Sequence, residues 1–263
     1  MLKVENISFS IGGTPIINDI NLEAKKGEIL TIVGPNGCGK STLLKIISRI
    51  YKPTSGKVTL LDKDVHDYDT KDLAKIMAIL PQKKTVAGDM TVEQLVQYGR
   101  YPHTKLGNRL TPFDYQKVEE AMKDTGIIHF RKSLINTLSG GESQMAWIAM
   151  CVAQAPEIIL LDEPTTYLDI SYQLEVLELV KKLNKQYGLT IVMVLHDINQ
   201  AIKYSDKIYA MKKGKGYKFG SAKDIFNEET FADIFRVKMN KLYDKNDEKI
   251  TYYQPERSLK NNE

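Results

Sequence analysis

The stretch Gly34-Pro35-Asn36-Gly37-Cys38-Gly39-Lys40-Ser41 decides the interpretation of this chain. It follows a short apolar run and opens a segment of helical periodicity, and it matches the pattern G-x-x-x-x-G-K-[ST]. Glycines let successive backbone N–H groups converge on an anion, and the start of a helix adds a partial positive charge. Lys40 offers a mobile charge for the β- and γ-phosphates, and Ser41 a hydroxyl for Mg²⁺. The stretch predicts a nucleoside triphosphate site rather than a glycine-rich turn that binds nothing.

Short β-rich runs alternate with helical patterns around this loop, which is typical of an α/β fold with a mostly parallel sheet flanked by helices. We expect strands at residues 2–9, 16–22, 29–33, 57–61, 158–161 and 190–195, and a helix at 40–50. Turns are expected at Gly12-Gly13-Thr14-Pro15 and Pro53-Thr54-Ser55-Gly56. From Thr91 to about Ala155 the pattern is helical, which indicates an insert of roughly 70 residues within the sheet.

Composition limits the class of protein. The 263 residues carry 37 Lys and Arg against 33 Asp and Glu, a net charge of +4 that gives no argument for binding nucleic acid. Two cysteines, Cys38 and Cys151, cannot form a disulfide framework, which favours a reducing compartment. No apolar run reaches the roughly 18–20 residues of a membrane span, and an acidic residue near the start does not suit a signal peptide. We therefore expect a protein that neither spans a membrane nor is exported.

Two adjacent carboxylates, Asp162 and Glu163, end the apolar run that begins at Ile158. Open α/β sheets bind ligands at the carboxyl ends of their strands, and alternation along a strand gives the two acids different tasks. Asp162 is expected to hold the hydration shell of Mg²⁺, and Glu163 to orient the attacking water and take its proton. A solvated acidic turn is the alternative.

Two further residues are placed for phosphate chemistry. His196 directly follows the apolar run 190–195, so it should reach the same edge of the sheet and contact phosphate, although a lone histidine is more often structural. Gln82 follows Pro81 where the core becomes the helical insert, and its amide could bind Mg²⁺ or water.

The segment Leu138-Ser139-Gly140-Gly141-Glu142 opens a helix. Ser139 followed three residues later by Glu142 is the pattern of a capping box, which would be purely structural. Two glycines at a helix start cost about 1 kcal/mol each, yet they let a backbone approach an anion. A second phosphate-binding helix terminus is the functional alternative.

Taken in order, these motifs resemble those of the ATP-binding cassette (ABC) ATPases. Gly34 to Thr42 resembles the Walker A motif, Pro81-Gln82 the Q-loop and Leu138 to Glu142 the signature. Ile158 to Glu163 resembles Walker B, Tyr167-Leu168-Asp169 the D-loop, and His196 the switch histidine. The resemblance covers about residues 1–225.

The resemblance implies a P-loop NTPase (RecA-like) core, with an antiparallel β subdomain and an inserted α-helical subdomain. The core would comprise 1–82 and 158–226, the helical signature subdomain 83–157, and a C-terminal extension packed on the core 227–263, ending in a frayed Asn261-Asn262-Glu263. It also implies a head-to-tail dimer that holds two ATP, each between one chain's Walker A and the other's signature. Ser41, Gln82 and Asp162 would serve Mg²⁺, Glu163 would be the general base, and His196 would hold the γ-phosphate. The second chain would contribute the signature residues Ser139, Gly140 and Gly141, and Asp169 of the D-loop would also bind nucleotide.

A finer resemblance is to the ATPase subunits of importers for ferric siderophores, haem and cobalamin. It rests on Tyr98 to His103, Ala146 to Met150 and Pro164 to Ile170. It implies docking on separate permease subunits at the cytoplasmic face of the membrane, through the region Gln82 to His103, and an extracytoplasmic substrate-binding protein as an indirect partner. The family resemblance also implies that Gln82 would link hydrolysis to a partner.

Several positions depart from the family pattern. Glu142 stands where the signature usually has Gln, and Ser143 and Met145 replace basic residues of the subgroup. The position that usually stacks on adenine is Ile11, while Phe9 on the same strand face could substitute or belong to the core. The alternative function is that of an iron–sulfur assembly ATPase.

A lysine-rich stretch follows the last predicted strand of the core. We expect this stretch, Lys212-Lys213-Gly214-Lys215-Gly216, to be a solvated hairpin turn.

Overall fold

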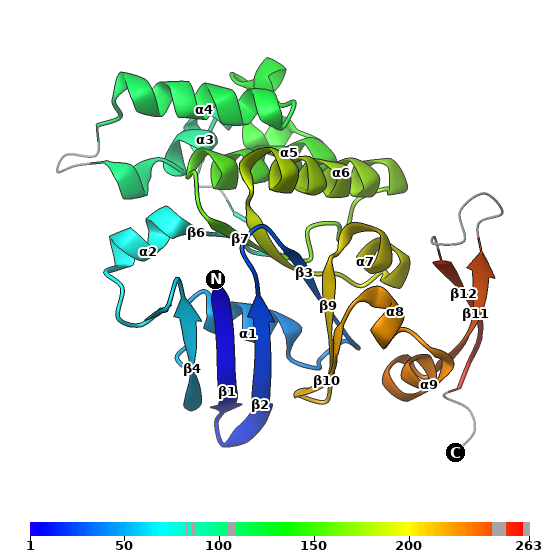
Figure 1. Cartoon of the computed structure of the whole chain (residues 1–263). Coiled ribbons are helices and arrows are strands. Elements are labelled where there is room, and N and C mark those ends of the chain that lie inside the picture. Colours follow the sequence, from blue (N-terminus) through cyan, green and yellow to red (C-terminus); the bar gives the residue numbers. More distant parts are fainter. Residues whose placement is uncertain (83, 86–87, 105–108, 244–250, 260–263) are drawn as a thin grey trace. The chain divides into compact units, whose positions relative to one another are not determined.

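A computed structural model describes residues 1–82, 84–85, 88–104, 109–243 and 251–259 (Figure 1). The chain forms two compact units, Met1–Val65 with Val192–Glu263 (unit 1) and His66–Ile191 (unit 2). The boundary between the units falls within strand β8 (Thr190–Val194). The frayed end expected at 261–263 lies outside the described residues. The expected division into core, helical subdomain and C-terminal extension stays a prediction.

Unit 1 begins with an antiparallel sheet in the order β2-β1-β4-β5. Its strands are β1 (Leu2–Ile11), β2 (Thr14–Ala24), β4 (Ser55–Leu60) and β5 (Lys63–Asp64). The turn expected over four residues contains only Gly12 and Gly13, whose φ of 55° and 82° suit a tight hairpin, so Thr14 already pairs with Ile11. Leu61 was wrongly expected in a strand, because Leu61 and Asp62 have positive φ and make the turn to β5.

The glycine-rich loop follows a strand of the second sheet of unit 1. Strand β3 (Ile29–Val33) is buried throughout and pairs in parallel with β9 (Lys207–Lys212), which pairs antiparallel with β10 (Lys215–Gly220). Helix α1 (Lys40–Ile47) follows the loop. It ends earlier than residue 50 because Arg49 adopts a φ of 62°, and the N–H groups of Ile50 and Tyr51 both bond to the Lys45 carbonyl.

The rest of unit 1 follows β8 and β10. Its elements are α7 (Ile198–Tyr204), α8 (Ala222–Ile225), α9 (Glu228–Thr230), the π-helical turn η4 (Phe231–Phe235), β11 (Val237–Tyr243) and β12 (Thr251–Ser258). Strands β11 and β12 form their own antiparallel hairpin, visible beside α7 in Figure 1. Phe226, Phe231 and Tyr253 form a buried aromatic cluster here, which explains how the tail is held.

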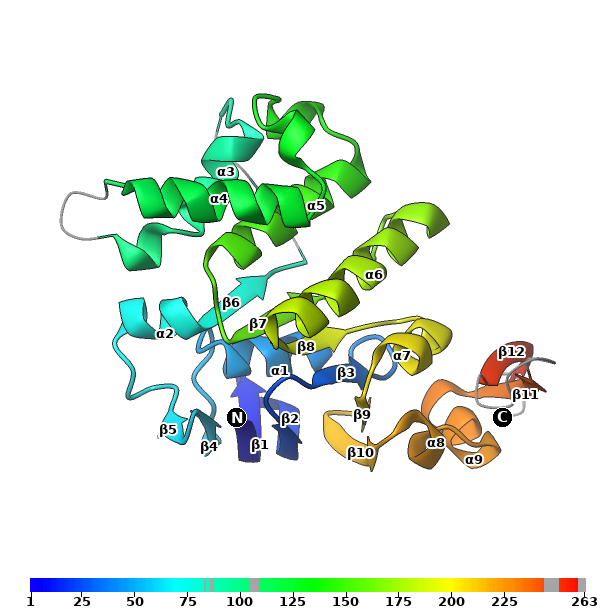
Figure 2. The same cartoon turned by 45° about the horizontal axis from the view of Figure 1, so that its top comes forward.

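Unit 2 is mainly helical, as expected from the pattern over 91–155 (Figure 2). Its elements are α2 (Thr70–Ile76), β6 (Met77–Leu80), α3 (Val92–Tyr98), η1 (Tyr101–His103), α4 (Pro112–Asp124), η2 (Ile128–Phe130), η3 (Ile135–Thr137), α5 (Gly140–Ala153), β7 (Ile158–Asp162) and α6 (Ile170–Tyr187). Strands β6 and β7 pair in parallel, so both carboxyl ends lie at one edge. The helical stretch is interrupted at Tyr101 to His103, which form a single 3₁₀ turn.

Candidate active site

The glycine-rich loop of unit 1 adopts conformations that its glycines make accessible. Gly34 has a φ of 152°, and a Cβ there would lie 2.4 Å from the Met211 carbonyl oxygen. Gly39 has a φ of 101° and caps α1 without a side-chain hydrogen bond, so the first N–H groups of the helix receive no capping side chain. The loop therefore forms a backbone cradle that suits an anion.

Lys40 places a buried charge against this cradle. Its side chain is 5% exposed, and Nζ donates to the carbonyl oxygens of Gly34 at 2.8 Å and Pro35 at 3.0 Å. An ammonium held by two neutral carbonyls can exchange them for the more strongly accepting oxygens of a phosphate. Ser41 follows directly on α1, half-buried, in the position expected of the hydroxyl ligand.

A pocket of about 730 Å³ opens beside the loop within unit 1. It is lined by Gly34 to Cys38, His196, Lys212, Lys213 and Ala232 to Arg236. His196 is exposed and lies two residues beyond β8, so it shares this pocket with the predicted phosphate-binding residues. Its contact with phosphate stays a prediction.

The lysine-rich hairpin and the tail were not predicted to line this pocket. The expected hairpin turn is present, and it is confined to Lys213 and Gly214, with φ of 48° and 76°, because Lys212 already pairs with Lys215. The turn is not simply solvated, however, because the Gly214 N–H donates to the Cys38 carbonyl at 3.1 Å. This contact spans about 175 residues of chain, and no local pattern could have indicated it.

Unit 2 carries the acidic residues. Asp162 is 5% exposed at the end of β7, whereas Glu163 is half-buried with a φ of 54°, so the two side chains have different environments, as alternation predicts. One carboxylate oxygen of Glu163 accepts from Gln82 Nε2 at 2.5 Å and from Thr166 Oγ1 at 3.1 Å. The structure thus brings Gln82 and Glu163 together, while the sequence motif did not single out Thr166.

The segment that resembles the signature forms a capping box. Ser139 Oγ accepts from the Glu142 N–H at 3.3 Å, and the Glu142 carboxylate accepts from the Ser139 N–H at 2.8 Å. The hydrogen bonds from the backbone and side chain of Ser139 lower the pKa of Glu142. The structural alternative is therefore present, and phosphate binding by this terminus stays a prediction.

The two signature glycines have different surroundings. A Cβ at Gly141 would lie 2.1 Å from the Tyr172 ring, so this glycine is required for packing against α6. A Cβ at Gly140 would meet only Leu168, at 3.6 Å, and this residue is exposed. Gly140 is thus the glycine available to a ligand.

The segment that resembles the D-loop ends at the start of α6. The Asp169 carboxylate accepts from the Tyr172 N–H at 2.9 Å and caps this helix. Beside it, Tyr167 is 96% exposed and Ile170 77% exposed. These two large apolar side chains are exposed beside Asp169, a predicted nucleotide-binding residue. Such an exposed apolar pair suits a contact with another protein chain.

Whether Phe9 or Ile11 contacts adenine stays a prediction. Phe9 is half-buried, and its ring lies parallel to that of Tyr51 with centroids 5.3 Å apart. Ile11 is 54% exposed near the end of β1. Tyr51, which the sequence analysis did not single out, already covers one face of Phe9.

Whether the predicted residues suit Mg²⁺ can be judged from the ligand atoms that they offer. Among the residues that the structure describes, no three His, Cys, Asp or Glu side chains gather as a metal site. The predicted set of Ser41, Gln82 and Asp162 offers a hydroxyl, an amide and a carboxylate oxygen. These hard oxygen donors suit Mg²⁺, which normally keeps waters and substrate phosphates as its other ligands. The donor types are those that Mg²⁺ prefers, and the assignment of these three residues to the ion stays a prediction.

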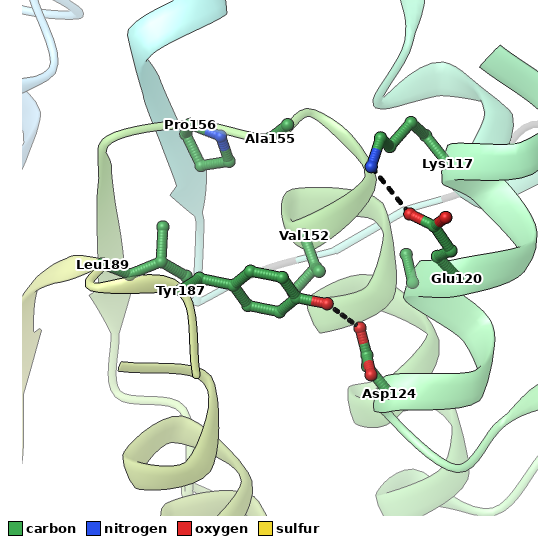
Figure 3. A pocket seen from close by; sticks show the side chains of 9 residues that line it. Lys117, Glu120, Asp124, Val152, Ala155, Pro156, Tyr187 and Leu189 are labelled. Atoms are coloured by element: carbon green, nitrogen blue, oxygen red, sulfur yellow. Dashed lines mark hydrogen bonds and ion pairs between the residues drawn. The ribbon is translucent and has the colours of Figure 1, made fainter. Parts of the chain in front are cut away.

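A second cavity lies within unit 2 and is separate from the predicted residues (Figure 3). It has a volume of about 250 Å³ and lies among residues of α4, α5 and the end of α6. The Tyr187 hydroxyl donates to Asp124 there, and burial followed by this hydrogen bond raises the pKa of Tyr187 to about 12. We assign this cavity no role in nucleotide chemistry.

Within the described ranges, no helix is both long and apolar enough to cross a membrane.

The phosphate loop and the acidic strand end are the features of a P-loop ATPase. A family model described as ABC transporter matches residues 17–166. The chain is 44% identical to the iron(3+)-hydroxamate import ATP-binding protein FhuC of Bacillus subtilis, over 90% of this chain and 88% of that protein. It is 42% identical to the ferric enterobactin transport ATP-binding protein FepC of Escherichia coli, over 90% and 88%. The chain belongs to the ABC transporter family, in which it is an ATP-binding, ATP-hydrolysing subunit.

Solved structures agree with this fold. An ABC transporter described as of metal-chelate type, in an inward-facing conformation, superposes with a TM-score of 0.85 at 30% identity, over 97% of each chain. The dimeric cassette MJ0796 superposes with a TM-score of 0.74 at 30% identity, over 84% of this chain and 99% of that one. The fold predicted from the sequence, a P-loop NTPase core with β and helical additions, is confirmed.

Proposed function

We propose that this chain is the motor subunit of an importer for a metal chelate of the ferric siderophore type, working on separate permease subunits. The observation that carries the nucleotide chemistry is the cradle at Gly34 to Lys40, in which a buried ammonium donates to the carbonyl oxygens of Gly34 and Pro35. The substrate class is supported by the relatives, which are ATP-binding proteins for iron–hydroxamate and ferric enterobactin transport.

In this proposal the triphosphate lies on the N–H groups of residues 34–42, with the Lys40 ammonium on the β- and γ-phosphates. Ser41, Gln82 and Asp162 would hold Mg²⁺, which supplies positive charge for the phosphate oxygens when bound. His196 contacts the γ-phosphate. Glu163 orients one water for in-line attack and takes its proton, and the hydrogen bonds from Gln82 and Thr166 hold the carboxylate in place.

A second copy of the chain completes the site in this proposal. Ser139, Gly140 and Asp169 of one copy face the nucleotide of the other, and the exposed Tyr167 and Ile170 lie in the contact between copies. Closure of the pair excludes water from the γ-phosphate, and hydrolysis releases it. The permease holds the pair at the cytoplasmic face of the membrane through the region Gln82 to His103, and an extracytoplasmic binding protein delivers the chelate.

The test compares the chain with Lys40→Ala. We expect the unmodified protein to bind and hydrolyse MgATP, Lys40→Ala to lose binding, and Lys57→Ala, an exposed lysine paired with Glu5, to behave like the unmodified protein. Equal ATP affinity in Lys40→Ala contradicts the phosphate assignment.

Import is tested in cells. Deletion of the gene should abolish uptake of iron from a ferric siderophore, and the unmodified gene, but not Lys40→Ala, should restore it. Normal chelate uptake in the deletion strain, together with loss of iron–sulfur enzyme activity, would instead favour the non-transport alternative.

A further inference from the structure

The C-terminal part of unit 1 forms one wall of the pocket beside the phosphate loop. Ala232 to Arg236, from the π-helical turn η4 and the residue after it, line this pocket together with Gly34 to Cys38 and His196. Phe9, Ile11 and Tyr51, the residues around the candidate adenine position, are not among its lining residues. Lys40 and Ser41 are not among them either, so the tail lies beside the Gly34 to Cys38 part of the phosphate loop and beside His196.

Two sets of contacts hold this wall in place. Lys212 Nζ and the Asp233 carboxylate form an ion pair at 2.6 Å, which joins η4 to the hairpin edge of the same pocket. Lys218 Nζ donates to Thr230 Oγ1 at 3.0 Å just before η4. Phe231 packs on Tyr253, with ring centroids 4.6 Å apart. The wall is thus anchored by both polar and aromatic contacts.

The tail is also joined to the helix that follows His196. The Asn199 amide on α7 exchanges two hydrogen bonds with the backbone of Tyr253, at 2.9 Å and 3.1 Å. The Tyr253 hydroxyl in turn donates to the Phe226 carbonyl at 2.8 Å. The wall and the residue predicted to hold the γ-phosphate are therefore parts of one packed arrangement within unit 1.

Arg236 is the residue of this wall that presents a charge without a matching one. Its φ of 54° ends η4, and its carbonyl accepts from the Leu259 N–H at 2.8 Å, so its backbone position is determined on both sides. Lys212 is paired with Asp233, but within the described part of the chain no ion pair involves the guanidinium of Arg236, which is exposed. An arginine in the left-handed region is uncommon and costs free energy.

We propose that Arg236 is a further nucleotide-binding residue, whose guanidinium contacts the terminal phosphate of the bound triphosphate. The inference rests on the proposed function, because it requires the triphosphate at the phosphate loop. A guanidinium donates in a planar fork that matches two phosphate oxygens, which an ammonium cannot do. The C-terminal segment then distinguishes ATP from ADP, since only ATP carries a γ-phosphate.

The test measures the dissociation constants of ATP and ADP with Mg²⁺ for four proteins. Arg236→Asn removes the guanidinium and keeps a residue that tolerates positive φ, and Arg236→Lys keeps the charge but loses the fork. Arg257→Ala is the matched control, because Arg257 is an exposed arginine on β12, in the same C-terminal part of unit 1, and does not line the pocket. The unmodified protein is the reference.

We expect Arg236→Asn to weaken ATP binding about tenfold and ADP binding by less than about twofold, with Arg236→Lys between and Arg257→Ala unchanged. Should Arg236→Asn not fold, Arg236→Gln is measured by the same criterion. Unchanged ATP affinity in the folded variant, or equal weakening of ATP and ADP, overturns the proposal. If the unmodified protein binds no ATP, the proposed function itself fails; if it binds ATP while Lys40→Ala does not, only the role of Arg236 is at stake.

Discussion

The side-chain amide nitrogen of Gln82 donates a hydrogen bond to the carboxylate of Glu163, with 2.5 Å between the two atoms. The two residues are 81 positions apart, and they meet because β6 and β7 pair in parallel and end at the same edge. This hydrogen bond places the Gln82 amide directly on the carboxylate proposed as the general base.

Replacing Gln82 should therefore disturb catalysis more than binding. We expect Gln82→Ala to lower the kcat of ATP hydrolysis about tenfold and to leave the KM for ATP within about twofold, because an orienting donor to the base is lost. The matched control is Gln116→Ala on α4, where the same kind of amide–carboxylate bond, to Glu120 at 2.8 Å, is exposed. Steady-state kinetics of both variants decide the matter, and an equal effect of the two would contradict a special role for Gln82.

Glu163→Gln should separate binding from hydrolysis. The substitution keeps the size of the side chain but removes the base, so we expect kcat to fall by about 10²- to 10⁴-fold while ATP stays bound. A stable ATP-dependent dimer should accumulate, which light scattering coupled to size exclusion detects. Glu175→Gln, an exposed glutamate on α6, serves as the control. Normal turnover in Glu163→Gln would remove this residue from the role of base.

The two signature glycines should respond differently to alanine. Gly141→Ala places a methyl group into the Tyr172 ring, so we expect a loss of unfolding free energy of about 1–3 kcal/mol. Gly140→Ala should leave the unfolding free energy within about 0.5 kcal/mol, because the surroundings of Gly140 are open. It should reduce ATP hydrolysis, because the added methyl group would lie where the nucleotide of the second copy is proposed to bind. Urea unfolding and ATPase assays measure the two effects. Tyr172→Ala combined with Gly141→Ala should recover part of the lost stability if the clash is the cause.

The buried ion pair between Arg100 and Asp114 should stabilise unit 2. Arg100 Nε lies 2.9 Å from the carboxylate, both side chains are at most 6% exposed, and Arg100 also donates to the Ala153 carbonyl at 2.8 Å. Asp114→Asn leaves a buried charge without its partner, so we expect a loss of about 3–5 kcal/mol in urea unfolding. Glu119→Gln, which breaks the exposed pair with Lys123, should leave the unfolding free energy nearly unchanged, because solvent screens this pair.

The same pair should make stability depend on pH in the acidic range. Burial alone would raise the pKa of Asp114, but hydrogen bonds from Thr111 and from Arg100 outweigh it and lower the pKa below the ordinary 3.8. The unfolded chain therefore takes up this proton at a higher pH than the folded one, and the stabilisation present above about pH 4 is lost as the pH falls through the folded pKa. Unfolding free energies between pH 5 and pH 2 should fall more steeply for the unmodified protein than for Asp114→Asn.

Local patterns were most informative where the chemistry is local. The loop from Gly34 to Ser41 is recognisable because each glycine, the lysine and the hydroxyl have a task within eight consecutive residues. The capping box at Ser139 and Glu142 is likewise contained in one helical turn, and the structure has both of its hydrogen bonds. The predicted ends of helices and strands were less accurate, because residues such as Arg49 and Leu61 adopt a positive φ that their residue type does not indicate.

Contacts between distant segments could not be derived in this way. The packing of Gly141 against Tyr172, the bond from Gly214 to Cys38 and the placement of Arg236 beside the phosphate loop each join parts of the chain that no period connects. The tail shows this most clearly, because no sequence pattern indicated that residues 232–236 line the pocket beside the loop.

The amino-acid sequence by itself determined the kind of chemistry: a cradle of glycine amides, one lysine and a carboxylate at a strand end specify triphosphate hydrolysis through covalent structure and short-range geometry. Only the tertiary structure decided which side chains surround that chemistry, such as the amide that steadies Glu163 and the arginine beside the loop. Those neighbours depend on how sheets and helices pack, which is a sum of many weak contacts over the whole chain rather than a property of any one segment.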